Sequence, residues 1–126
     1  MTNLQRIYTK IFCGALFFAV TTGMILAQDV AKVSPESHKV LLDNDHVRVL
    51  QVRLKPGEKV GMHSHPASVI YYLSNAKVRI TLPDGKTQVR ECKAGTAAFA
   101  PPVTHAVENI GKTDLIEVQT ELKTVK

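Results

Sequence analysis

From Lys39 onward, short runs rich in β-branched residues alternate apolar and polar positions, and turn-forming residues separate the runs about every eight to twelve positions. This pattern is typical of an all-β sandwich or barrel. No stretch after Gln28 keeps a helical apolar period over three turns, so we expect helices to be short or absent. Residues 39–126 are therefore predicted to form one all-β domain, with residues 28–38 as an N-terminal extension.

Two local features place individual strands. The alternating segment 77–82, the turn PDGK at 83–86 and the returning segment 87–91 together predict a β-hairpin. In the segment 47–54 the apolar phase changes near Leu50, which predicts a β-bulge or a sharp bend at that point of the strand.

The last predicted strand covers residues 114–122. Its apolar residues Ile116, Val118 and Leu122 alternate with polar ones, so we expect the apolar side to face inward. Glu117 and Glu121 would then point into solvent, where a carboxylate is an improbable metal ligand.

Residues 1–27 have the composition of a secretory signal peptide. Arg6 and Lys10 lie in a polar start, an apolar run follows, and no acidic residue occurs before Asp29. We expect cleavage after Ala27, which predicts export to the periplasm or the cell exterior with no stable membrane span afterwards. The alternative is an uncleaved anchor, because the apolar stretch is close to the shortest length that spans a bilayer.

The composition excludes several classes of protein. With 44% hydrophobic and 21% charged residues the chain is an ordinary globular one rather than a disordered tail. Its formal net charge is +5, and Arg6 and Lys10 contribute part of it, so the charge is too small to indicate a nucleic-acid partner. Cys13 lies in the predicted signal peptide, which leaves Cys92 without an intrachain partner, and we expect Cys92 to be buried.

The histidines give the strongest indication of chemistry. His63 and His65 are two residues apart, so on a strand both rings project from one face with their Cα atoms about 6.5 to 7 Å apart. Neutral imidazole is a common ligand of divalent transition metals, and His105 is the candidate for a third ligand from another strand. An HxH pair alone is weak evidence, so the surrounding residues matter.

These surroundings resemble the two motifs of the cupin superfamily. The first motif, a glycine, five residues and HxH, corresponds to GEKVGMHSH from Gly57, followed by PASVIYYLSN. The second corresponds to GTAAFAPPVTHAVEN, which ends at Asn109. The resemblance implies a small jelly-roll barrel of the single-domain, cupin type 2 conserved-barrel kind. It also implies a divalent metal ion at the centre of the barrel, with His63, His65 and His105 as its ligands.

The sequence departs from these motifs at three places. The glutamate expected after HxH is absent, because Ser68 or Val69 stands there; Val103 stands where glycine is common; and Asn75 replaces the glycine that ends the first motif. Serine does not replace a carboxylate as a strong ligand. A site of three neutral histidines would keep the full charge of the ion and favour an anionic substrate.

The cupin superfamily that these motifs resemble includes three-histidine members that bind iron and oxidise thiols or diketones. Together with the predicted signal peptide, the resemblance therefore implies an exported, dioxygenase-like enzyme that acts on a small anionic molecule, with Fe(II) as the first choice of metal and Zn, Mn, Ni or Cu as the others. Two alternatives stay open: a non-catalytic barrel that binds a small molecule or a metal, and a barrel in which the histidines are purely structural. A homodimer through edge strands is also expected.

Four further predictions concern residues other than the three candidate ligands. His38 and His46 lie in a polar stretch and are predicted to be on the surface. One of the consecutive residues Tyr71 and Tyr72 should face inward, most simply as a core residue. Asn109 should stabilise a turn. Four arginines alternate with apolar positions as on solvated strand faces, and an anion-binding residue among them cannot be assigned from the sequence: Arg48, Arg53, Arg79 and Arg90.

Overall fold

The computed structural model describes residues 28–124. In this part of the chain one short helix, α1 (Val30–Val33), precedes nine strands, so the predicted all-β fold class is confirmed. The strands are β1 (His38–Asp43), β2 (Val47–Leu54), β3 (Lys59–His65), β4 (Ser68–Tyr72), β5 (Ala76–Thr81), β6 (Thr87–Cys92), β7 (Ala97–Ala100), β8 (Val103–Asn109) and β9 (Leu115–Leu122).

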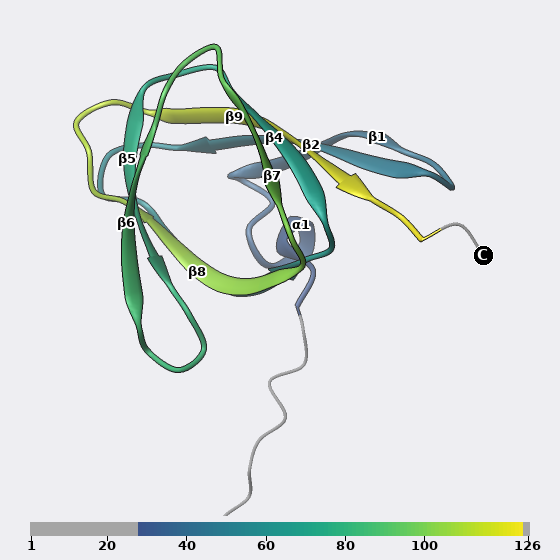
Figure 1. Cartoon of the computed structure of the whole chain (residues 1–126), viewed down its shortest axis with the longest axis horizontal. Coiled ribbons are helices and arrows are strands. Elements are labelled where there is room, and N and C mark those ends of the chain that lie inside the picture. The colour runs from purple at the N-terminus through teal and green to yellow at the C-terminus, as the bar shows by residue number, and fades with distance from the viewer. Residues whose placement is uncertain (1–27, 125–126) are drawn as a thin grey trace, which may run out of the picture.

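The strands form two sheets that face each other as the layers of a sandwich (Figure 1). One sheet has the order β1-β2-β9-β4-β7, and the other has the order β3-β8-β5-β6. All pairs of these strands are antiparallel. Because β3 and β8 are neighbours in a sheet, the topology brings the HxH segment next to the segment that contains His105.

The interior between the sheets is filled by alternate side chains of both layers. Val78 and Ile80 are only 3% and 8% exposed, so these apolar positions of the alternating segment 77–82 face inward. The buried apolar core consists of Val30, Leu50, Val52, Leu54, Val60, Ile70, Tyr72, Ala76, Val78, Ile80, Cys92 and Leu115.

The predicted hairpin is confirmed. β5 and β6 pair in regular register from Ala76 with Cys92 to Thr81 with Thr87. Gly85 has a φ of 82°, a left-handed conformation that glycine adopts without a steric penalty, and it therefore closes the turn between the two strands.

The predicted bulge lies in a different strand from the one expected. β2 pairs with β9 without interruption, and the irregularity occurs in β1 between Val40 and Leu42, opposite Val49 and Leu50. Leu41 is the extra residue. The change of apolar phase in β2 has another cause. The first three residues of β2 are half-buried on both faces, and the alternation of buried and exposed residues begins only at Leu50.

The orientation predicted for the last strand is wrong. In β9 the inward row is Leu115, Gln119 and Glu121, which are 3%, 4% and 2% exposed, whereas Leu122 is 41% exposed. The sandwich interior accepts this polar row because partners inside it satisfy Gln119 and Glu121. Glu117 belongs to the same row and lines an internal cavity.

Residues 28–38 pack onto the sandwich. Asp29 caps the N-terminus of α1 by accepting a hydrogen bond from the backbone N–H of Ala31, and it forms a parallel bridge with Ser64. Val30 is completely buried, and α1 contacts β1 and β3. This segment thus closes the sandwich beside the HxH strand.

The predicted signal peptide, residues 1–27, lies outside the described residues, and so does Cys13. Between residues 28 and 124 no helix has the length and hydropathy that crossing a membrane requires.

Candidate metal centre

The structure brings the three predicted ligands together. His63 and His65 both point inward from β3 and are 2% and 5% exposed. His105 lies directly opposite His63 on β8. The ring centroid of His63 is 4.8 Å from that of His65 and 4.8 Å from that of His105, and the rings of His65 and His105 are 5.6 Å apart.

A fourth histidine joins this cluster. His38 is 5% exposed, and one ring nitrogen of each of His38, His63 and His65 lies within 4.8 Å of the others. The prediction of His38 as a surface residue is therefore wrong, whereas His46 is exposed as predicted. His38 faces inward because it opposes the buried Val52 across the β1–β2 pair, and opposed residues of a sheet share a face.

The ring nitrogens of His105 fall outside the group that lies within 4.8 Å. Its ring nevertheless lies as close to the ring of His63 as the ring of His65 does. The four rings thus form one cluster with His63 at its centre.

The hydrogen bonds of three rings determine their tautomers. Nδ1 of His63 lies 2.7 Å from the carbonyl oxygen of Gly61, and Nδ1 of His65 lies 2.6 Å from a carboxylate oxygen of Glu121. Both partners can only accept, so Nδ1 carries the proton in each ring.

The third ring follows the same rule. Nδ1 of His38 lies 2.8 Å from Oγ of Ser37, whose own hydroxyl donates to the carbonyl of Ser34, so Nδ1 of His38 is also the donor. When each of these three rings is neutral, Nε2 is therefore the nitrogen that carries the lone pair.

Three of the four rings, those of His38, His63 and His105, are held in the neutral form. Burial lowers the pKa of His38 to about 4, and the neighbouring His63 and His65 act in the same direction. Burial also lowers the pKa of His63, and burial together with the adjacent histidines lowers the pKa of His105 to about 3. Neutral imidazole is the form that binds metal ions.

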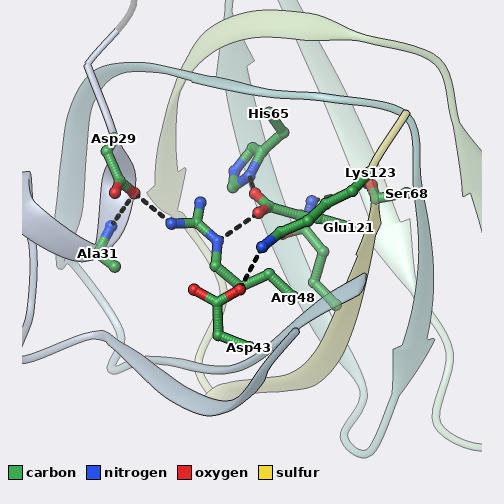
Figure 2. Close-up of polar contacts among 9 residues, drawn as sticks. Asp29, Ala31, Asp43, Arg48, His65, Ser68, Glu121 and Lys123 are labelled. Carbon is green, nitrogen blue, oxygen red and sulfur yellow. Dashed lines mark hydrogen bonds and ion pairs between the residues drawn. The ribbon is translucent and has the colours of Figure 1, made fainter. Parts of the chain in front are cut away.

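A polar network anchors His65 from behind. Arg48 donates through Nε to Glu121 at 2.6 Å and through Nη1 to Asp29 at 2.8 Å, and Glu121 in turn accepts from His65 (Figure 2). Figure 2 shows Arg48 lying between the N-terminal segment and β9.

The same contacts overturn two predictions. The side chain of Arg48 is only 16% exposed, and that of Glu121 is 3% exposed, so neither is the solvated residue that the sequence suggested. Burial alone would raise the pKa of Glu121, but hydrogen bonds from His65 and Arg48 outweigh this effect and lower the pKa below its usual range.

The arrangement fits a divalent cation of the transition-metal type. Several nitrogen lone pairs converge, and the ring N–H groups bind to a carbonyl, a carboxylate and a hydroxyl on the far side. Such outer hydrogen bonds are the usual means by which proteins orient metal-binding histidines. Converging lone pairs repel one another unless a cation or proton donor lies between them, so the chemistry of the donor set matches a metal ion.

The position of the missing carboxylate is occupied by an uncharged pair. Ser68 is fully buried, and its Oγ accepts a hydrogen bond from Nε2 of Gln119 at 3.0 Å. No carboxylate replaces the expected glutamate at this place. The negative charge of Glu121, which is hydrogen-bonded to the ring of His65, would instead offset part of the charge of a bound cation.

The histidines line a cavity of about 230 Å³ between the two sheets. Most of its wall is apolar, and its exposed lining residues belong to β6 and to the segment from Phe99 to Pro102, so the cavity opens between β6 and β7. Besides the histidines, its polar lining residues are Gln88, Arg90, Glu117 and Gln119.

The predictions for the tyrosine pair, Asn109 and Cys92 are confirmed. Tyr72 is 6% exposed and belongs to the core, while Tyr71 is 45% exposed. Asn109 is fully buried and stabilises the β8–β9 turn. Its amide donates to the carbonyls of Leu54 and Thr113. Cys92 is buried and free.

The chain is similar to several solved structures. A cupin domain from Bordetella pertussis is 27% identical with a TM-score of 0.64, and the match covers 69% of this chain and 92% of that one. A conserved, uncharacterised protein with a double-stranded β-helix domain from Klebsiella pneumoniae is 23% identical with a TM-score of 0.55, over 77% and 89% of the two chains.

An RmlC-like cupin family protein from Methanocaldococcus jannaschii is 17% identical with a TM-score of 0.55, over 68% of this chain and 78% of that one. The last two likenesses concern the fold alone. No protein-family model and no curated protein matches this sequence.

Proposed function

We propose that this chain, a small single-domain protein with the cupin or double-stranded β-helix fold, binds one divalent metal ion through His63, His65 and His105. The observation that carries the proposal is the cluster of inward imidazoles between the sheets: ring nitrogens of His38, His63 and His65 lie within 4.8 Å of one another, and the ring centroid of His105 lies 4.8 Å from that of His63. His38 belongs to this group, so the proposed site includes it as a fourth nitrogen donor in place of the absent carboxylate.

The donor set limits the metal. Imidazole suits Fe, Zn, Ni and Cu, whereas Mn prefers sites richer in oxygen ligands. We propose Fe(II) as the physiological ion, with Zn, Ni, Cu or Mn as alternatives to be separated by analysis. An iron ion in this site would supply the redox chemistry that oxygenation of a small anionic molecule requires.

The chain's own residues would prepare the site. Gly61, Glu121 and Ser37 accept from the Nδ1–H groups and hold each ring in one tautomer and one orientation. Apolar side chains, among them Val52 and Ile70, line the rest of the cavity and limit the access of water to it.

The proposed activity is dioxygenase-like, on a small anionic substrate. The cavity is open at one side and large enough for a small molecule, which supports this proposal. A non-catalytic protein that binds a metal ion or a small molecule in the same cavity is the second candidate, and the absent glutamate favours it.

Two further parts of the proposal concern the setting of the protein. We propose that residues 1–27 direct export and are removed, since they have the charge and apolar pattern of a signal peptide. We also propose a homodimer. Val40, Leu41 and Leu42 on the edge strand β1 are 43%, 50% and 49% exposed, and a second copy would cover this apolar edge.

Elemental analysis of the purified protein tests the metal site. We expect about one equivalent of a transition metal in the wild type, and loss of it in His63→Ala and His105→Ala. His46→Ala, an exposed histidine, is the matched control and should keep the metal. A full equivalent in both site variants would refute the proposed ligands.

Thermal unfolding gives an independent readout. An ion at about 100 times its dissociation constant adds about 2.7 kcal/mol to the free energy of unfolding, which corresponds to roughly 10 to 20 °C for a domain of this size. A chelator should remove this increment, and an unchanged midpoint would favour purely structural histidines.

Oxygen uptake separates the enzyme from the binding protein. The iron-loaded protein should consume oxygen with at least one member of a panel of small thiols, diketones and amino-acid-derived acids. Absence of uptake from a sample with full iron content would favour the non-catalytic candidate.

A further inference from the structure

Three of the four strand arginines are neutralised by carboxylates. Arg48 pairs with Asp29 and Glu121, and the two others form the pairs Arg53–Asp114 and Arg79–Glu108. Arg90 differs from them, because it forms no ion pair with any carboxylate between residues 28 and 124. It is also the only one of the four that lines the cavity.

A carboxylate without a partner lines the same cavity. Glu117 points inward from β9, and no side-chain hydrogen bond or ion pair to it is found within the described residues. Its carboxylate is open to the cavity, since no fully buried side-chain oxygen in this part of the chain lacks a partner. Burial raises its pKa to about 7, which shows how poorly its surroundings solvate the charge. A group in this position gains most from a hydrogen-bond donor or a cation.

The two residues come from opposite walls of the cavity. Arg90 lies on β6 and Glu117 on β9, which belong to different sheets of the sandwich. The charge of Arg90 opposes the rise in the pKa of Glu117 and helps burial and the other histidines to lower the pKa of His105. Arg90 therefore lines the same cavity as Glu117 and His105, and its charge acts on both.

We propose that Arg90 and Glu117 recognise a small amino acid, with its carboxylate bound by Arg90 and its ammonium group bound by Glu117. This inference rests on the proposed function, since it names the substrate class of the same cavity. The carbon chain between the two charged groups would lie against the apolar lining of the cavity. The volume of about 230 Å³ equals roughly eight water molecules and admits only a small member of this class.

Calorimetric titration of the metal-loaded protein at pH 8 tests the proposal. The probes are glycine, β-alanine and γ-aminobutyrate, each compared with the carboxylic acid that lacks its amine and the amine that lacks its carboxylate. These comparison compounds are acetate, propionate and butyrate, and methylamine, ethylamine and propylamine. At least one amino acid should bind tenfold or more tightly than both of its comparison compounds.

Variants assign the two recognition roles. Arg90→Gln should remove the advantage of the amino acid over the amine, and Arg90→Lys should restore part of it. Glu117→Gln should remove the advantage over the carboxylic acid. The matched controls are Arg79→Gln and Glu91→Gln, which change the net charge equally at positions that do not line the cavity.

Each outcome decides the question. Absence of any tenfold preference, or a preference that survives in both Arg90→Gln and Glu117→Gln, would overturn the proposal. Elemental analysis of the same samples separates the two levels of inference. A protein that holds no metal as purified and takes up none on loading, yet shows the preference for the amino acid, would refute the proposed metal function and keep the amino-acid site. A full equivalent of metal without any preference for an amino acid would refute the amino-acid site and keep the proposed metal function.

Discussion

Glu121 and His65 join the last strand of the sandwich to the histidine cluster, because a carboxylate oxygen of Glu121 accepts the Nδ1–H of His65 at 2.6 Å. Both side chains are 3% exposed, so water does not compete for this bond. The contact places a proton on Nδ1 of His65, so Nε2 is the nitrogen that the neutral ring offers to a metal ion, and it places a negative charge directly behind that ring.

Glu121→Gln should therefore weaken metal binding. The amide keeps an oxygen acceptor for His65 but removes the charge, and loss of such outer partners lowers metal affinity by about 10- to 100-fold. Competition with a chelator of known affinity measures the change. Glu108→Gln is the control, because Glu108 pairs with Lys59 and Arg79 and does not line the cavity. Equal affinities of the two variants would contradict the role assigned to Glu121.

Arg48→Ala should destabilise the fold. Glu121 would keep its burial but lose a charged partner, and breaking a buried ion pair from one side costs about 3 kcal/mol. Urea denaturation of the metal-free protein measures the loss. Arg53→Ala removes a pair whose arginine is 62% exposed and should cost less than about 1 kcal/mol. A similar loss of unfolding free energy in both variants would show that the buried ion pairs of Arg48 stabilise the fold no more than the exposed pair of Arg53 does.

Much of the fold follows from the sequence because the evidence is local. The period-two alternation and the PDGK turn define β5 and β6 without any long-range information. The HxH spacing likewise places His63 and His65 on one face of a strand. His105 needs more than spacing, and only its resemblance to a known motif connected it with the other two.

The remaining members of the site depend on contacts that the sequence does not show. His38 lies in a polar stretch, and its inward position follows from its pairing with Val52 across β1 and β2. Glu121 belongs to a strand whose inward row is polar, so the rule that apolar residues face inward gives the opposite orientation. Buried charges become predictable only after their partners, here Arg48 and His65, are known.

Asn109→Ala should be strongly destabilising. Its Nδ2 donates to Leu54 and Thr113, and its Oδ1 accepts from the backbone of Gly111, all with the side chain fully buried. Loss of these bonds leaves backbone groups without partners and costs about 3 kcal/mol. Asn75→Ala removes one exposed hydrogen bond to Ala94 and should cost less than about 1 kcal/mol. Denaturant midpoints of the two variants check this difference.

Glu117→Gln should change how stability depends on pH. Burial raises the pKa of Glu117 from 4.5 to about 7, and the groups near it are Arg90 and Cys92 on β6 and Tyr72 on β4. The folded state therefore binds more protons than the unfolded state between these two pH values, so the wild type loses stability as the pH rises through this range.

The variant has no group that titrates at this position, so it should gain stability relative to the wild type as the pH rises from 4.5 to 7, by up to about 3 kcal/mol. Free energies of unfolding of both metal-free proteins at pH 5 and pH 8 measure the effect, since other titrating groups contribute equally to both. Glu91→Gln, at an exposed position, should show a constant difference from the wild type. A constant difference for Glu117→Gln as well would mean that Glu117 is not held in a poorly solvated cavity.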